Sequence, residues 1–343
     1  MIQNRRNFLM TAAAFGGAAV VGFTSRPARA GTTMTGVYYI PQSYRALSYG
    51  PNGFVERLNA SDAVDVEYYD SGRLVKADEQ LPALRAGSID FMFHTTSYIN
   101  RSIPILGAVG LPSVAGELYA NPSRLAKGSP LFELINEELA KDDLYMVSMM
   151  GNILEPEYIW STKDAPIRSI DDLKGKKVSV VSYEATKVIE SFGAAAVRIP
   201  SSELYLALQR RTVDAAVVNP STVIGRSLEP LLDIVYKLPI NGYGIALFVD
   251  RRKWEVMDKT VKAAVEEAAA WLDENGAAHA NDKIYPEEYW PTIIEAGTEV
   301  VEPPEDELTR LEQAAETVIA EWKAGVGEGA GARAIALATG AGG

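Results

Sequence analysis

Short apolar segments alternate along the chain with segments in which apolar residues recur every three or four positions. The first pattern is typical of buried strands, and the second is typical of helices that pack one face against a core. The predicted strands are Met34–Ile40, Val64–Tyr69, Ile89–Phe93, Tyr158–Ser161, Lys177–Val181, Asp214–Val218 and Ile245–Asp250. The predicted helices are Tyr49–Asn59, Glu79–Ala86, Ser169–Leu173, Glu184–Phe192, Glu203–Arg210, Lys259–Asn275 and Leu308–Lys323. This alternation predicts βαβ units that build mostly parallel sheets flanked by helices.

The predicted elements fall into two similar sets, the second of which begins after Tyr158. A chain of 343 residues is also too long for one small core. We therefore predict an α/β fold with two lobes and a cleft between them, where ligands of such sheets gather. The predicted parts are lobe I at 33–155 plus 243–284, lobe II at 156–242 plus 285–304, a helix at 305–325 that braces both lobes, and a flexible Gly/Ala-rich tail at 326–343.

The first 30 residues are typical of an export signal. Arg5 and Arg6 stand in an acid-free stretch, the apolar run Phe8–Phe23 follows, and Ala28 and Ala30 flank one residue in the small-x-small pattern of a cleavage site. The apolar run is shorter than the roughly 20 residues needed to span a bilayer. We therefore expect cleavage after Ala30 and release into the periplasm. The paired arginines resemble a twin-arginine signal, which exports folded proteins.

The composition excludes several kinds of chemistry and partner. The chain has no cysteine, so disulfides, thiolate metal sites, cysteine nucleophiles and a cysteine-linked lipid anchor are all excluded. Its formal net charge is −12, and it becomes −16 when the predicted signal is removed, because that segment carries four arginines and no acid. So negative a chain is not expected to bind nucleic acid.

Residues suited to catalysis are scarce. Only two histidines are present, and no nucleophile elbow, phosphate-binding glycine loop or zinc-binding helix motif occurs. We therefore expect no enzyme activity, no cofactor and no metal. His94 follows a predicted apolar strand, where a loop facing the cleft would begin. It is either a hydrogen-bonded core residue or a ligand contact, and the sequence leaves both interpretations open.

Aromatic and acidic residues gather near the predicted strand ends. Tyr39, Tyr158, Trp160, Tyr183 and Tyr243 indicate a partly apolar pocket with polar tips. Two acids, Glu155 and Glu157, flank Pro156 at the start of the second set of elements. They are either solvated loop acids or a pair of acceptors for hydroxyl or ammonium groups.

Several motifs in a fixed order resemble one family. They are Asp70–Leu74, Glu79–Gln80, Leu84–Asp90 and Leu111–Pro112 in the first half, and Ile170–Lys177, Ser202–Gln209, Val213–Asp214 and Asn219–Pro220 in the second. The second group is similar to the "DLKGxK", "SExYxALQ" and "VDGxxNP" segments of the solute-binding proteins of tripartite ATP-independent periplasmic (TRAP) transporters, of the DctP type. The resemblance covers about residues 33–325.

The resemblance implies a periplasmic-binding-protein-like fold of type II, with a hinge between the lobes that closes around one small organic molecule. It implies delivery of this molecule to the membrane subunits of a TRAP permease, and we expect the receptor to be a monomer. The implied ligand-binding residues are Tyr39, Gln42, His94, Thr95, Tyr158, Trp160, Ser179, Tyr183, Arg198, Ser201, Asn219 and Tyr243.

The chain departs from the family at one important position. The family usually has Gly-x-Lys-x-Arg, and this arginine binds the carboxylate of the ligand, but Ser179 stands there in the present sequence. Serine cannot replace a bidentate arginine–carboxylate pair. A neutral ligand or a small cation is therefore expected, unless Arg73 or Arg198 supplies the missing clamp. The ligand itself is not identified by the sequence.

Two other functions remain as alternatives. A periplasmic sensor component of a receptor kinase would show the same sequence features as a transport receptor. A secreted hydrolase is disfavoured by the missing catalytic motifs and the scarce histidines.

The export signal gives a first prediction. Changing Arg5 and Arg6 together to lysine should leave the precursor in the cytoplasm, because the twin-arginine pathway recognises the paired arginines. Cell fractionation followed by immunoblotting measures the distribution. Normal export of the double variant would contradict the twin-arginine route and would leave export by another route intact.

Overall fold

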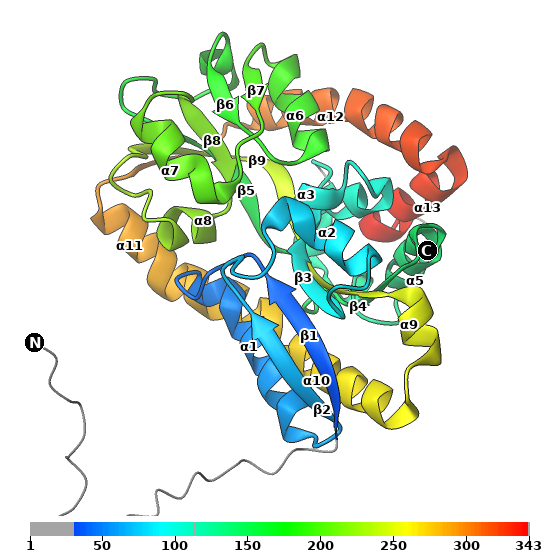
Figure 1. Ribbon diagram of the computed structural model, residues 1–343. Coiled ribbons are helices and arrows are strands. Elements are labelled where there is room, and N and C mark those ends of the chain that lie inside the picture. Colours follow the sequence, from blue (N-terminus) through cyan, green and yellow to red (C-terminus); the bar gives the residue numbers. More distant parts are fainter. Residues whose placement is uncertain (1–30, 113, 342–343) are drawn as a thin grey trace, which may run out of the picture.

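The computed structural model describes residues 31–112 and 114–341, and the predicted signal at 1–30 lies outside the described residues. Two sheets, each covered by helices, form the two halves of the molecule (Figure 1). We call the half around the five-stranded sheet lobe I and the half around the six-stranded sheet lobe II. The predicted two-lobe α/β fold is thereby confirmed, while the residue boundaries assigned to the lobes stay predictions.

The sheet of lobe I has the strand order β2-β1-β3-β10-β4. Its strands are β1 (Thr32–Tyr38), β2 (Val64–Tyr69), β3 (Phe91–Thr95), β4 (Leu144–Ser148) and β10 (Ile245–Asp250). β1 runs parallel to β2 and β3, whereas β10 is antiparallel to both β3 and β4. Alternate side chains of β3 face opposite sides, so Phe91 and Phe93 join the core beneath helices α1 (Arg45–Ala60) and α10 (Lys259–His279), and Met92 joins the other core.

The sheet of lobe II has the strand order β11-β9-β5-β8-β6-β7. Its strands are β5 (Leu154–Ser161), β6 (Lys177–Ser179), β7 (Ala195–Val197), β8 (Ala215–Val218), β9 (Ile234–Tyr243) and β11 (Glu299–Val301). The central strand β5 is antiparallel to both β8 and β9, and each of its residues is buried.

The remaining helices cover the two sheets. They are α2 (Ala77–Arg85), α3 (Thr96–Ile99), α4 (Val114–Ala120), α5 (Pro130–Leu139), α6 (Tyr183–Ser191), α7 (Ser201–Gln209), α8 (Pro220–Gly225), α9 (Arg251–Val256), α11 (Trp290–Glu295), α12 (Glu305–Val326) and α13 (Glu328–Thr339). The 3-10 segments are η1 (Pro104–Val109), η2 (Pro122–Arg124), η3 (Ala140–Asp142) and η4 (Ile170–Leu173), and η5 (Ala280–Tyr289) is π-helical.

The chain passes between the lobes where β4 leads to β5, where β9 leads to β10, and through the continuous helix α10–η5–α11 (Figure 1). Helix α12 contacts both lobes, as predicted for the long C-terminal helix. The indole of Trp322 donates a hydrogen bond to the carbonyl oxygen of Pro104 in η1 over 2.7 Å, and Arg310 pairs with Asp171 in η4 over 2.8 Å.

The C-terminal segment corrects one expectation. We expected the Gly/Ala-rich stretch to fray, but residues 328–339 form α13, which packs against α4, α5 and α12. Gly331, Ala334 and Ala338 recur at helical spacing and are buried, so small side chains let this helix approach its neighbours closely. Arg124 donates to the carbonyl oxygen of Ala338 over 3.0 Å. The Gly/Ala-rich composition alone did not predict this helix, because it does not record the spacing of the buried residues.

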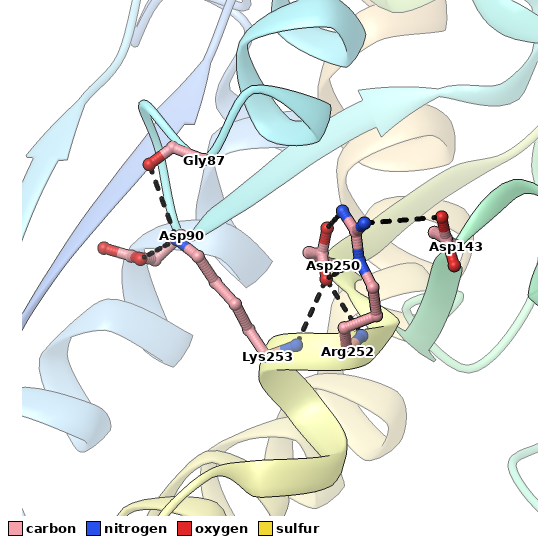
Figure 2. A network of polar contacts seen from close by, with 6 residues as sticks. All are labelled: Gly87, Asp90, Asp143, Asp250, Arg252 and Lys253. Atoms are coloured by element: carbon pink, nitrogen blue, oxygen red, sulfur yellow. Dashed lines mark hydrogen bonds and ion pairs between the residues drawn. The ribbon is translucent and has the colours of Figure 1, made fainter.

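Figure 2 shows how α9 is fixed to lobe I. The carboxylate of Asp250 accepts hydrogen bonds from the backbone N–H groups of Arg252 and Lys253 over 2.9 and 3.1 Å and so caps the helix. The ammonium of Lys253 reaches Asp90 over 2.9 Å and the carbonyl oxygen of Gly87 over 3.5 Å. Gly87 has a φ of 72°, which confirms the predicted left-handed cap after α2.

Among the described residues, no helix combines the length and the hydropathy that a membrane crossing requires. The same part of the chain contains no group of three or more His, Asp or Glu side chains placed to hold a metal ion.

The packing of α13 can be tested by substitution. Ala334→Asp should lower the free energy of unfolding by about 2–4 kcal/mol, because it buries an unpaired carboxylate against α4 and α5. Ala332→Asp, at an exposed position of the same helix, should change it by less than about 0.5 kcal/mol. Urea unfolding measures both. Equal effects of the two variants would show that α13 does not pack as described.

Candidate functional site

A small cavity lies at the boundary of the two lobes, and residues of both lobes line it. Its volume is about 20 Å³, which is room for roughly one water molecule. The lining residues are Tyr39, Tyr98, Glu157, Ser179, Val181, Ile199, Ser201, Leu204, Val217, Val218, Thr222 and Tyr243. A solute of several heavy atoms would therefore enter only if the lobes separated.

Larger hollows occur elsewhere on the molecule. One of about 350 Å³ lies between α10, the β4–β5 connection and the region of α4 and η2. It does not lie between the two sheets, and its acid Asp273 has a structural role, because it accepts hydrogen bonds from Ser148 and the backbone of Gly151. The smaller cavity at the lobe boundary is therefore the better candidate site.

A buried carboxylate stands in the cavity wall. Glu157 on β5 lies opposite Asn241 on β9, and the amide of Asn241 donates to its Oε2 over 2.6 Å. Glu157 is 6% exposed. Burial raises its pKa to about 8, and the hydrogen bond from Asn241 only partly opposes this rise.

The residues next to Glu157 along β5 face away from the cavity. The indole of Trp160 donates to the carbonyl oxygen of Val218 over 2.9 Å and stacks on Trp290, with ring centroids 5.8 Å apart. The hydroxyl of Tyr158 donates to Glu155, which also accepts a hydrogen bond from Trp290. Glu155 and Glu157 are two positions apart in β5, so regular alternation would place both side chains on the same face of the sheet. Their surroundings nevertheless differ, because the register of β5 against β9 shifts on both sides of Glu157.

Tyrosines of lobe I form another part of the cavity wall. The rings of Tyr39 and Tyr98 lie 4.9 Å apart, and the hydroxyl of Tyr39 shares a hydrogen bond with the hydroxyl of Thr95 over 2.7 Å. The hydroxyl of Tyr98 accepts a hydrogen bond from the backbone N–H of Ser201 in lobe II over 2.9 Å. Burial raises the pKa of Tyr98 to about 12, so these hydroxyls are neutral at physiological pH.

His94 is a core residue in the structure. Its ring is fully buried, and its two nitrogens lie 3.0 Å from the carbonyl oxygen of Thr95 and 2.9 Å from that of Ala77. Burial lowers its pKa. Of the two interpretations left open by the sequence, the hydrogen-bonded core residue fits this geometry.

The two arginines considered as substitute clamps pair with acids of the chain. Arg73 pairs with Asp70 over 2.8 Å on the surface. Arg198 of lobe II pairs with Asp78 of lobe I over 2.7 Å, and its guanidinium lies 5.5 Å from the ring centroid of Tyr98. Neither arginine lines the cavity. Arg198 therefore connects the two lobes at the rim of the cavity.

Arg226 makes a second connection across the lobes. Its Nε donates to the hydroxyl of Tyr44 over 3.0 Å, and one terminal nitrogen lies 3.4 Å from the hydroxyl of Ser201. Ser43 of lobe I also donates to the carbonyl oxygen of Gly225 over 2.9 Å. The lobes are thus in direct contact around the cavity.

Three further predicted site residues lie outside the cavity lining. Gln42 is exposed and bonds to Asn52 and Asp70. Tyr183 is 38% exposed at the start of α6. Asn219 is buried, but it caps α8 by accepting from the N–H of Ser221 over 2.8 Å. Of the predicted site residues, the structure brings together Tyr39, Ser179, Ser201 and Tyr243 at the cavity.

Sequence reasoning missed several residues of the cavity wall. Tyr98 and Thr222 were not among the predicted ligand-binding residues. Glu157 was considered only as one member of an acid pair. Two features distinguish Glu157 from Glu155: its place in the alternation along β5, and Asn241 opposite it on β9. The second feature depends on the register between the two strands, which the sequence does not give.

Two buried acids predict how stability depends on pH. Burial raises the pKa of Glu157 to about 8 and that of Glu184, which accepts from Asn100, to about 7. Both folded-state pKa values lie above the ordinary value of 4.5, so the folded state binds these two protons more tightly than the unfolded state does. The resulting contribution to the free energy of unfolding is fully present below pH 4.5 and is lost as the pH rises through about 7 and 8.

Glu157→Gln should therefore raise Tm by roughly 2–5 °C at pH 9 and leave it unchanged at pH 4.5. Thermal unfolding followed by circular dichroism between these two values measures the effect. Glu203→Gln, at an exposed position of α7, controls for the change in net charge. A parallel pH dependence of Tm in Glu157→Gln and the unsubstituted protein would contradict the burial of an unpaired carboxyl at this position.

Comparison with known proteins agrees with the fold. A model of the family described as bacterial extracellular solute-binding protein, family 7, matches residues 52–324. A solute-binding protein of Albidiferax ferrireducens is 25% identical over 172 residues, which are 49% of this chain and 48% of the relative. The chain spans about half the length of the curated relatives it matches first.

Solved structures share the fold over most of the chain. The Bordetella pertussis extracytoplasmic solute receptor DctP7, which binds pyroglutamic acid, superposes with a TM-score of 0.80 at 18% identity and covers 90% of this chain and 99% of its own. A TRAP periplasmic solute-binding protein of Sulfitobacter, with bound β-D-galacturonate, superposes with a TM-score of 0.77 at 17% identity. The match covers 90% of this chain and 100% of the Sulfitobacter chain. The resemblance seen in the motifs is confirmed: the chain belongs to bacterial extracellular solute-binding protein family 7, a family of binding proteins and not of enzymes.

Proposed function

We propose that this protein captures a small organic molecule between its two lobes and delivers it to the membrane subunits of a TRAP-type permease. Membership of the solute-binding family supports capture. The observation that carries the proposal is the cavity at the lobe boundary, because residues of both lobes contribute to its wall and direct contacts between the lobes surround it. A site built in this way is complete only when the lobes are closed.

The proposed ligand lacks a free carboxylate. The ligands named for the solved relatives, pyroglutamic acid and galacturonate, are both acids. The wall of the present cavity contains Ser179 where the family resemblance places an arginine, and it contains no Lys or Arg among the described residues. A carboxylate there would be buried without a partner, next to the carboxyl of Glu157.

The protein is proposed to act in the periplasm as a monomer after its signal is removed. The first strand begins at Thr32, so cleavage after Ala30 would leave β1 intact. The strongly negative mature chain suits a soluble receptor.

A thermal-shift screen of a metabolite library tests capture. A solute that binds the folded protein raises its Tm, and we expect at least one neutral or cationic compound to do so. No response from any compound in a library that contains neutral, cationic and acidic metabolites would contradict the proposed function.

The contact between Arg198 and Asp78 gives a second test. This pair is exposed, with side chains 44% and 55% accessible, so it should contribute at most about 1 kcal/mol to lobe closure. Arg198→Ala should therefore weaken binding of each responding compound by no more than about fivefold, whatever its charge. Asp78→Ala should have the same effect. Selective loss of acid binding in Arg198→Ala would instead identify Arg198 as a relocated carboxylate clamp.

A further inference from the structure

Glu157 is a buried carboxyl group with an incomplete set of partners. Asn241 holds Oε2, and among the described residues no donor reaches Oε1 within hydrogen-bonding distance. No Lys, Arg or His of that part of the chain lies within ion-pair distance of either oxygen. A carboxylate removed from water in this way is destabilised unless a cation or a proton accompanies it.

The chain keeps this acid in the wall of a cavity that residues of both lobes line. The position is well defined, because Glu157 and Asn241 face each other across β5 and β9 and bond directly. The same amide also donates to the carbonyl oxygen of Gly242 over 2.8 Å, which fixes its orientation. The carboxyl is therefore held in one place at the point where a solute would sit.

The cavity that contains this carboxyl also has aromatic residues in its wall. Tyr39, Tyr98 and Tyr243 line the same cavity; Tyr39 and Tyr243 are buried, and Tyr98 is partly exposed. Rings of this kind attract ammonium and other organic cations through their electron-rich faces. A carboxylate together with tyrosine rings is a chemical environment that suits a cation and disfavours an anion.

The fixed cations of the region are occupied elsewhere. Arg198 pairs with Asp78, and Arg226 bonds to Tyr44 and lies near Ser201. Neither side chain lines the cavity. A positive charge beside Glu157 would therefore have to come from outside the chain.

We propose that Glu157 binds the cationic nitrogen of the captured solute, so that the substrates of this receptor are organic amines or related cations. This inference rests on the proposed function, since it requires that a solute enters the cavity between the lobes. The ammonium would lie against Oε1 of Glu157, and the apolar part of the solute would contact the side chains of Ile199, Leu204 and Val217 in lobe II. A charge-assisted hydrogen bond would then replace the proton that burial otherwise holds on the carboxyl.

The rival explanation is that Glu157 remains protonated and donates a hydrogen bond to a neutral carbonyl of the solute. The two explanations differ in what glutamine would do at this position. The amide of glutamine can donate a hydrogen bond as a protonated carboxyl does, but it cannot balance a positive charge.

Matched probes separate these cases. Calorimetry would measure the binding of three sets of compounds on shared scaffolds: the amines propylamine, benzylamine and putrescine, the alcohols propanol, benzyl alcohol and butanediol, and the acids propionate, benzoate and succinate. We expect the best amine to bind at least about tenfold more tightly than its alcohol and its acid. Glu157→Gln should remove this preference by weakening amine binding about tenfold or more, with alcohol binding changed less than about twofold.

Control variants make the result specific. Glu203→Gln removes one exposed negative charge from α7 and should leave the preference for amines unchanged. Glu157→Asp keeps the charge and should keep the order of amine over alcohol. Circular dichroism of each variant establishes that it folds.

Three results would overturn the inference. Amines that bind no more tightly than their alcohols, or amine binding that survives Glu157→Gln, would exclude Glu157 as the anchor of a cation. Tighter binding of the acids, lost in Arg226→Ala, would show that Arg226 moves in to bind a carboxylate. In each of these cases the proposal that the protein captures a solute remains intact. The proposed function itself would be contradicted if none of the three sets of compounds bound and no compound of the library raised Tm.

Discussion

The two sheets are joined where β4 leads to β5, where β9 leads to β10, and through the helix α10–η5–α11. Because the chain crosses at these places, the ends of β5 and β9 lie beside the boundary of the lobes. The end of β9 is tightly packed: a Cβ atom at Gly242 would overlap the carbonyl oxygen of Val109, so only glycine fits. The cavity borders one of these crossings, because Tyr243 at the end of β9 lines it.

The central strand β5 has two different faces as a consequence. One side directs Glu157 to the cavity, where Asn241 of the neighbouring strand holds it. The other side carries Tyr158 and Trp160, which pack with Trp290 at the end of the long helix. The aromatic face therefore supports the strand, while the polar face supplies the group that a solute would meet. A substitution in the aromatic face is expected to lower the stability of the fold, whereas a substitution at Glu157 is expected to change the binding of the solute.

The periodicity of apolar residues predicted the two-lobe α/β fold, because helices and strands depend mainly on local sequence patterns. The strand Ile245–Asp250 has the predicted bounds, and both sheets draw their strands from two separate segments of the chain, as expected for two lobes. The site was harder to predict. Tyr158 and Trp160 were chosen because they are aromatic and near a strand end, but strand alternation and register shifts, which depend on the partner strand, turned them away from the cavity. The role of Arg198 depends on Asp78, which is 120 residues away in the chain.

The central claim is that the lobes separate and close around a solute. Because the chain has no cysteine, Glu79→Cys on α2 and Glu203→Cys on α7, both exposed, can be spin-labelled specifically, one in each lobe. Double electron–electron resonance then measures the distance between the labels. The account predicts a broad or long distance without solute and a single shorter distance at saturation with a compound that raises Tm. One unchanged distance under both conditions would contradict it.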